Sequence, residues 1–347
     1  MYYEKPPLLF KIKLLNFSTL LKTLKRNDIA SYFFLILSAL LFRLYTFTHL
    51  DKIPLNIDDF SGSFITLNLL YAFAKNNLFL FVLFSFIIQI LFALYLNFEV
   101  NKQKLIPKKD VLTAYTYLML SSLLPSLSLI TIHFFTSFFL ILPLWFIVDY
   151  NNAKQDSSQS FKIGFFTGLA TFLYAPSIIF IFLFLFLLYQ VHHYQIKDFV
   201  AKLLGLFSPF VIYFSISFLN DTFDEAIKTA QLDIHFPITI SNTLPSIVFI
   251  SLIIIILLFS LISYSINLSK YSTVARKKIQ MNILFLFISI LIALIYDKLP
   301  NTAFLLIISP FTILLRQTFH VGKEKMNNFA FWILTILTVG FQWFILR

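Results

Sequence analysis

Residues 78–97 have the sequence LFLFVLFSFIIQILFALYLN, an apolar run without a charged side chain. A helix of about 20 apolar residues crosses a hydrocarbon core that is roughly 30 Å thick. Further apolar runs lie at about residues 30–50, 112–150, 163–189, 199–219, 244–266, 280–316 and 328–346. The sequence therefore predicts an all-α protein, a polytopic transmembrane helical bundle.

The composition agrees with a protein that has lipid as its solvent. Hydrophobic residues make up 59% of the 347 residues and charged residues 12%, whereas soluble domains are roughly 45–50% apolar. The absence of Cys excludes disulfides, thiolate nucleophiles, iron–sulfur clusters and Cys-ligated zinc. The net charge of +11 does not indicate nucleic acid as a partner, because no segment is long enough to form a soluble basic module.

Two of the apolar runs are longer than one membrane span requires. The run 112–150 contains Leu124-Pro125-Ser126, and proline interrupts a helix, so we expect a tight hairpin of two short spans there. The run 164–189 forms either one long helix or two shorter helices that are broken at Tyr174-Ala175-Pro176. The distribution of charge favours the second option.

Lysine and arginine cluster in five connections, which the positive-inside rule assigns to the cytoplasm. All five are cytoplasmic only if residues 61–75 stay outside as an interfacial or re-entrant helix and residues 164–189 enter the membrane and return. This arrangement predicts about eleven passes through a bacterial inner membrane, with the N-terminus in the cytoplasm and the C-terminus outside. The basic residues are Lys102, Lys104, Lys108, Lys109, Lys154, Lys162, Lys197, Lys202, Lys270, Arg276, Lys277, Lys278, Arg316, Lys323 and Lys325; the outer loops contain Asp51, Asp58, Asp59, Asp221, Asp224, Glu225, Asp233, Asp297 and Lys298.

Three regions follow from this topology. Residues 1–29 place apolar side chains at helical spacing with lysines on the other faces, which predicts a cytoplasmic amphipathic helix that contacts anionic lipid headgroups. Residues 30–225 form a transmembrane core whose first outer loop is 51–77. Residues 226–347 contribute an outer loop and four C-terminal spans.

The acidic pair Asp58-Asp59 lies in the first outer loop. A carboxylate at that surface can act as a general base on a substrate that a lipid delivers. Alternatively, the pair caps a helix that begins near Ser61. Two carboxylates could also hold a divalent cation, although adjacent side chains in an extended loop point apart. No other cofactor is indicated.

The start of the chain resembles the GT-C class of membrane glycosyltransferases. Those enzymes place an acidic pair in the first outer loop, as Asp58-Asp59 are placed here after Arg43 and before a surface helix. Residues 164–170, GFFTGLA, followed by Tyr174-Ala175-Pro176, are similar to their glycine-containing short helix pair, and Leu206-Phe207-Ser208-Pro209 resembles their proline-bearing seventh span. The resemblance covers roughly the first 225 residues and implies a GT-C-like arrangement of the first seven passes.

The resemblance also implies roles for single residues. Asp58 or Asp59 would be the catalytic base, and the partner would be a polyprenyl phosphate that carries a sugar. Arg43 would contact the lipid phosphate, with Lys52 or His133 as less favoured candidates. Arg43 and His133 also have interpretations without a functional role. Arg43 can extend its side chain to the membrane interface, and His133 can be an interior hydrogen-bonded residue.

Two features depart from the GT-C pattern. Tyr174 stands where many members have a basic residue, and the large outer C-terminal domain of many members is missing. Gly164 and Gly168 also have a structural alternative, because two small residues four apart commonly allow close helix packing.

A closer resemblance is to an uncharacterised family of multipass inner-membrane proteins from Gram-negative bacteria. It rests on residues 117–125, YLMLSSLLP, on 164–176 and on 206–210. Some members carry a carotene monooxygenase label, but such oxygenases hold iron with four His side chains. The six here are too scattered to converge: His49, His133, His192, His193, His235 and His320.

Three hypotheses for function remain open from the sequence. The most specific is a glycosyltransferase that uses a polyprenyl-phosphate-linked sugar at the outer face. The second is a non-catalytic membrane subunit of an envelope, secretion or translocation complex. The third is a transporter or lipid flippase, although no internal repeat is evident. Membrane lipids are partners in all three.

Overall fold

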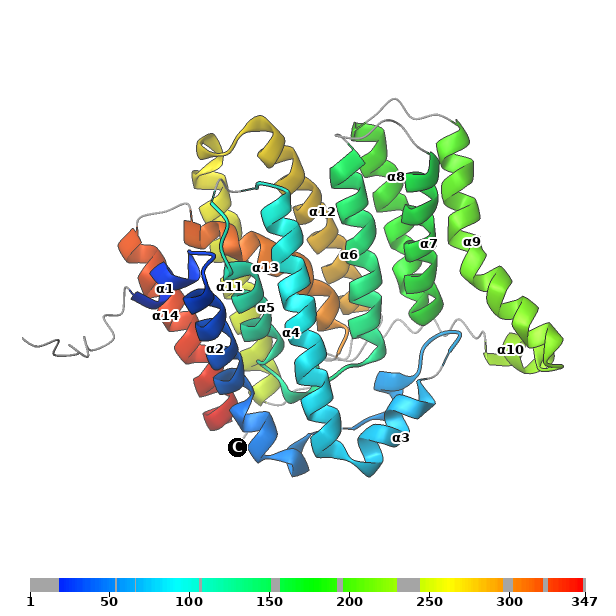
Figure 1. The fold of residues 1–347 in the computed structure, drawn as a ribbon, viewed down its shortest axis with the longest axis horizontal. Helices are drawn as coiled ribbons and strands as arrows, with labels where there is room; N and C mark the ends of the chain where they lie inside the picture. The colour runs from blue at the N-terminus through cyan, green and yellow to red at the C-terminus, as the bar shows by residue number, and fades with distance from the viewer. Residues whose placement is uncertain are drawn as a thin grey trace, which may run out of the picture.

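The computed structural model describes residues 19–53, 55–65, 67–105, 108–150, 157–191, 196–229, 244–295, 302–320 and 324–345. Regular structure in this part of the chain is helical (Figure 1). Six helices contain segments that are long and apolar enough to cross a membrane. They are α2 (Ile29–Thr48), α4 (Leu78–Lys102), α6 (Ile132–Tyr150), α9 (Ile196–Leu219), α11 (Leu244–Ile266) and α12 (Thr273–Ile295). A multipass membrane protein is therefore supported, and the number of eleven passes stays a prediction.

Shorter helices complete the bundle. They are α1 (Thr19–Leu24), α3 (Asn68–Asn76), α5 (Leu112–Ser121), α7 (Ser157–Leu173), α8 (Ile179–Val191), α10 (Phe223–Thr229), α13 (Phe304–His320) and α14 (Glu324–Gly340). Short 3₁₀ turns are η1 (Leu50–Lys52), η2 (Ile57–Phe60), η3 (Pro125–Ser128), η4 (Ala175–Ile178) and η5 (Leu268–Lys270), and η6 (Phe341–Ile345) is a π-helical turn. Of residues 1–29, the structure describes 19–29, where Leu21 and Leu24 of α1 are buried; the predicted amphipathic helix otherwise lies outside the described residues.

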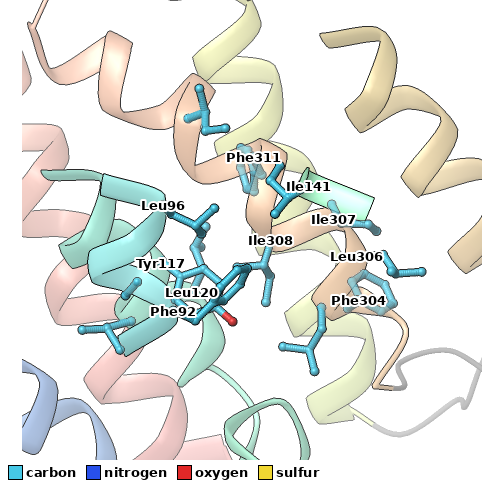
Figure 2. Close-up of a cluster of buried hydrophobic side chains, with 14 of the residues drawn as sticks. Phe92, Leu96, Tyr117, Leu120, Ile141, Phe304, Leu306, Ile307, Ile308 and Phe311 are labelled. Carbon is cyan, nitrogen blue, oxygen red and sulfur yellow. The ribbon is translucent and has the colours of Figure 1, made fainter. Parts of the chain in front are cut away.

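Helix α13 is the central helix of the bundle, although it is only 17 residues long. Every side chain from Phe304 to Phe319 is buried. Figure 2 shows side chains of α13 packing with Phe92 of α4, Tyr117 of α5 and Ile141 of α6. Removing a buried Phe side chain from such a core typically costs about 3–5 kcal/mol.

The two long apolar runs are broken where proline predicted a break. Helix α5 ends at Ser121, η3 begins at Pro125 and α6 begins at Ile132. Helix α7 ends at Leu173 and α8 begins at Ile179, with Pro176 in the intervening turn η4. Proline is favoured in a first helical turn, where its missing N–H has no partner to lose. The break at 124–126 and the two-helix interpretation of 164–189 are confirmed. That the helices on either side of 124–126 form a hairpin of two spans stays a prediction, because α5 has only ten residues.

Residues 61–75 do not form one surface helix. Only 68–76 are helical, as α3, and nine residues at 1.5 Å per residue span about 13 Å. Helix α3 is therefore too short to cross a hydrocarbon core of roughly 30 Å. Residues 61–65 form a turn instead.

Glycines allow α7 and α9 to pack closely along their lengths, and the two helices lie side by side in Figure 1. A Cβ atom on Gly164, Gly168 or Gly205 would lie 2.0 to 2.4 Å from a backbone carbonyl oxygen of the facing helix. That separation is far below van der Waals contact, so any larger residue forces the helices apart. The packing interpretation of Gly164 and Gly168 is supported.

The charged side chains divide the bundle into two ends. At the basic end, Lys102 of α4 pairs with Asp149 at the end of α6, and Lys278 of α12 donates to Gln103. The first loop, residues 49–77, lies at the opposite end, which we call the acidic end. Helices α6 and α13 run from one end to the other and connect the two.

Candidate functional site

The first loop is fixed to the break between α7 and α8. The Ser63 N–H donates to the carbonyl oxygen of Leu173 at 3.0 Å, and the Ala175 N–H donates to Ser63 Oγ at 2.8 Å. A Cβ atom on Gly62 would lie 2.4 Å from the Leu173 carbonyl oxygen, so only glycine fits there. The loop is held against the bundle by these contacts.

Phe60 anchors the same loop from the other side. Its ring is 2% exposed and lies 5.6 Å from the ring of Tyr71 and 5.9 Å from that of Phe81. Its carbonyl oxygen accepts a 2.8 Å hydrogen bond from Leu67 N–H. The turn η2 is thereby fixed to α3 and α4.

Asp58 and Asp59 lie in η2, immediately before Phe60. Asp58 is exposed and Asp59 is half-buried. Neither caps a following helix, because α3 begins only at Asn68, and its N-cap residue Leu67 makes no side-chain hydrogen bond. The capping interpretation of the acidic pair is wrong.

Asp59 takes part in a chain of hydrogen bonds with two residues that are distant in the sequence. Thr302 Oγ1 donates to Asp59 Oδ1 at 2.7 Å and lies 2.9 Å from Nδ1 of His133. A threonine hydroxyl has one proton, so His133 Nδ1–H is the donor in the second bond. The chain therefore runs from His133 through Thr302 to the carboxylate of Asp59.

The environment of Asp59 changes its proton affinity. Burial raises the pKa of the Asp59 carboxyl above its ordinary value, and the negative charge of Asp58 raises it further. The hydrogen bond from Thr302 opposes both effects, because it stabilises the ionised form. The net result is a carboxylate with a raised pKa, which makes it a stronger base than a solvated aspartate.

Tyr174, in the turn between α7 and η4, lies beside His133. Its ring centroid is 4.7 Å from that of His133 in an edge-to-face arrangement. This aromatic edge packs the imidazole but supplies no positive charge.

Arg43 lies away from this cluster and is 1% exposed. Its Nε donates to Ser122 Oγ at 2.9 Å and its Nη1 to the Ser128 carbonyl oxygen at 2.7 Å; its Nη2 donates to Gln89 Oε1 and Ser121 Oγ. All four acceptors are neutral protein groups. Arg43 therefore holds η3, the turn just before the helix that carries His133, and we leave it out of the site proposed below.

The remaining histidines do not approach His133 in the described structure. His49 stacks on Tyr45, and His320 contacts Asp110 near the basic end; His192, His193 and His235 lie outside the described residues. Within the described residues, no group of three or more His, Cys, Asp or Glu side chains is placed to hold a metal ion. A divalent cation at the acidic pair would have to rely on Asp58 and Asp59 themselves.

A second polar cluster at the basic end is not evident from the sequence. Arg316, which we assigned to a cytoplasmic loop, is fully buried in α13, and both oxygens of Asp110 lie 3.0 Å from its Nε. Its Nη2 donates to Asn101 Oδ1 at 2.7 Å, and His320 contacts the other side of the Asp110 carboxylate. Arg316 therefore lies in a helix and not in a loop, because Asp110 supplies a counter-charge inside the protein. The cytoplasmic side of this end of the bundle stays a prediction.

The pKa of Asp110 is shifted in the opposite direction from that of Asp59. Burial alone would raise the pKa of Asp110, but the hydrogen bond from His320 and the positive charge of Arg316 outweigh it and hold the pKa below its ordinary value. Asp110 is therefore ionised and has little tendency to accept a proton. It is a structural carboxylate.

No curated protein and no solved structure matches this chain. A family model matches residues 52–347, a range that includes Asp59, His133 and Thr302 and begins after Arg43. Because this match covers most of the chain, the protein belongs to the family of unknown function DUF6427.

Proposed function

We propose that this membrane protein is a glycosyltransferase of the bacterial inner membrane that transfers a sugar from a polyprenyl phosphate to a hydroxyl acceptor at the acidic end of the bundle. The observation that carries the proposal is the half-buried Asp59 with its raised pKa, in a loop fixed to the bundle and hydrogen-bonded through Thr302 to His133. The GT-C resemblance of the first 225 residues implies that either Asp58 or Asp59 is the base, which agrees with this choice.

Asp59 is the general base in this proposal. The acceptor hydroxyl attacks the anomeric carbon, its proton passes to Asp59 Oδ, the bond between that carbon and the phosphate oxygen breaks, and the polyprenyl phosphate leaves with the electron pair. A base with a raised pKa takes the proton more readily at neutral pH, and such catalysis typically contributes about 10²–10⁴-fold. Asp58 is exposed, and its negative charge contributes to the raised pKa of the base.

Thr302 and His133 position the base. The Thr302 hydroxyl is bonded to Oδ1 of Asp59, and in this proposal Oδ2 takes the proton of the acceptor. His133 fixes the hydroxyl proton towards Asp59, because its own Nδ1–H occupies the other side of Thr302 Oγ1. The membrane location suits a lipid-linked donor, since the loop connects the ends of α2 and α4 at the surface of the bundle.

The test is replacement of single carboxylates in a deletion strain that is scored for envelope glycans and glycoproteins. Asp59→Asn keeps the size of the side chain and removes the base. We therefore expect the rate of sugar transfer to fall by about 100-fold or more. Asp51→Asn is the matched control, because Asp51 is an exposed acid in the same loop. Membrane levels of each variant are measured in parallel.

Wild-type glycans with Asp59→Asn at normal protein level would contradict the enzymatic proposal. In that case copurification of a partner complex would favour the membrane-subunit hypothesis. Altered lipid or solute movement across vesicles without glycan change would favour the transporter hypothesis.

A further inference from the structure

A cavity of about 600 Å³ lies at the basic end, between the start of α2 and the end of α4. It is remote from Asp59, which lies at the acidic end, and the proposed reaction does not use it. Its lining combines apolar side chains with amides and two lysines: Asn27, Tyr32, Leu94, Asn97, Phe98, Asn101, Lys102 and Lys109. None of these lining residues is acidic.

The polar part of the cavity suits an anion. Lys109 is exposed at its rim. The ammonium of Lys102 donates to Asp149 at 2.8 Å and to Glu99 at 3.3 Å, which uses two of its three N–H groups. Two carboxylates therefore already contact Lys102, so its third N–H and the exposed Lys109 are the groups that remain for an anion. A phosphate between the two lysines would receive charge-assisted hydrogen bonds.

A buried amide marks the inner wall of the same cavity. Asn97 is 2% exposed, and its Nδ2 donates to the Asp110 carbonyl oxygen at 2.8 Å, which fixes the direction of the amide. Its Oδ1 is buried and inaccessible to solvent, so the amide forms part of the cavity wall and does not contact the ligand.

The apolar part of the cavity indicates that the anion belongs to a lipid. Leu94 and Phe98 line it from α4, and Phe98 is 64% exposed. The exposed apolar surface continues along the two helices, with Phe33 of α2 at 65% and Leu91 of α4 at 60%. Both helices are membrane-span candidates, so these side chains face acyl chains in a bilayer. A free phosphate would leave this surface unused.

We propose that the cavity between α2 and α4 binds the phosphate headgroup of an anionic phospholipid, with Lys102 and Lys109 at the phosphate and the acyl chains against Leu94 and Phe98. The site would secure the start of α2 to the end of α4. It is independent of the proposed glycosyl transfer, so either proposal can fail without the other.

The experiment measures binding of defined lipids to the purified full-length protein in a neutral detergent. The probes are phosphatidylglycerol, phosphatidylcholine and inorganic phosphate, and the readouts are native mass spectrometry and the shift in melting temperature. We expect phosphatidylglycerol to bind and stabilise, and the other two probes to have no comparable effect. Equal binding of phosphatidylcholine would overturn the proposal, as would stabilisation by inorganic phosphate that equals the effect of the lipid.

Two variants test the position of the site. Lys109→Gln should weaken phosphatidylglycerol binding about five-fold, since a lysine near an anionic surface contributes about 1 kcal/mol. Leu94→Trp should fill the cavity and abolish binding. Lys75→Gln is the control, because Lys75 is an exposed lysine of α3 at the acidic end. Unchanged binding by Lys109→Gln, or an equal loss in Lys75→Gln, would overturn the assignment.

Discussion

Two aspartates at opposite ends of the bundle each contact a residue in or next to α13, yet their pKa values are shifted in opposite directions. Asp59 accepts a hydrogen bond from Thr302, just before α13, and Asp110 pairs with Arg316, near the end of α13. The first partner is a neutral hydroxyl and the second a guanidinium. The hydrogen bond from Thr302 does not offset the burial of Asp59, whereas the hydrogen bond from His320 and the charge of Arg316 together outweigh the burial of Asp110, so the pKa of Asp59 is raised and that of Asp110 is lowered. The comparison separates a carboxylate suited to chemistry from one suited to structure.

The largest expected effect is on stability at the basic end. Asp110→Asn leaves the guanidinium of Arg316 buried without a counter-charge, and breaking a buried pair in this way costs about 3–5 kcal/mol. Asp59→Asn removes a carboxylate that has no cationic partner in the cluster described above, so it should leave stability at neutral pH unchanged or raise it. Unfolding of the two variants in detergent, monitored by circular dichroism, compares them directly.

The pH dependence provides the control for this prediction. Because the folded pKa of Asp110 is lowered, its contribution to stability is present above its unfolded pKa and is lost as the pH falls through the folded pKa. The wild type should lose this contribution on acidification, and Asp110→Asn should lack it. The double variant Asp110→Asn with Arg316→Met should recover part of the stability. Equal stability of wild type and Asp110→Asn at neutral pH would contradict the stabilising role that we assign to Asp110.

A smaller effect is expected from the partner of Asp59. Thr302→Val keeps the shape of the side chain and removes the hydrogen bond to the ionised carboxylate, which is typically worth about 1.5–3 kcal/mol. The pKa of Asp59 should rise further, so the acidic limb of the transferase pH profile should move to higher pH. Thr302→Ser retains the hydroxyl and should resemble the wild type. A Thr302→Val profile that coincides with the wild-type profile would show that this bond does not tune the base.

The smallest effect is expected from Asp58, whose charge contributes least to the raised pKa of Asp59. Asp58→Asn removes the like charge, so the pKa of Asp59 should fall and the acidic limb should move to lower pH. This shift of the acidic limb is opposite in direction to the shift expected for Thr302→Val. Comparing the two pH profiles therefore tests whether Asp59 is the titrating base. A larger loss of transfer in Asp58→Asn than in Asp59→Asn would reverse the roles that we assign to the two acids.

Local patterns were enough to predict most of the helices but not all of their ends. Pro125 and Pro176 lie in the 3₁₀ turns at the two breaks. Proline alone does not decide a break, since Pro143, Pro209 and Pro310 lie inside α6, α9 and α13. The start of α3 at Asn68 was not predictable in the same way. Residues 61–65 are held as a turn by Leu173 and Ala175, which lie more than a hundred positions away in the sequence.

The candidate site was predictable only in part for the same reason. Asp58 and Asp59 stand out because acids are rare in this chain, and His133 was a candidate by its type. Thr302 has no local signal, since a threonine before an apolar helix is common. Arg43 was predicted to contact a lipid phosphate, but its neighbours in the fold are Gln89 and the serines around η3.

The sequence by itself determined that this is a helical membrane protein and where several of its helices are interrupted, because hydrophobicity and proline geometry act through the chain locally. Only the tertiary structure decided which charges are compensated. It buried Arg316 against Asp110 and left Asp59 with Thr302, and the free energy of a carboxylate depends on the groups that surround it in space.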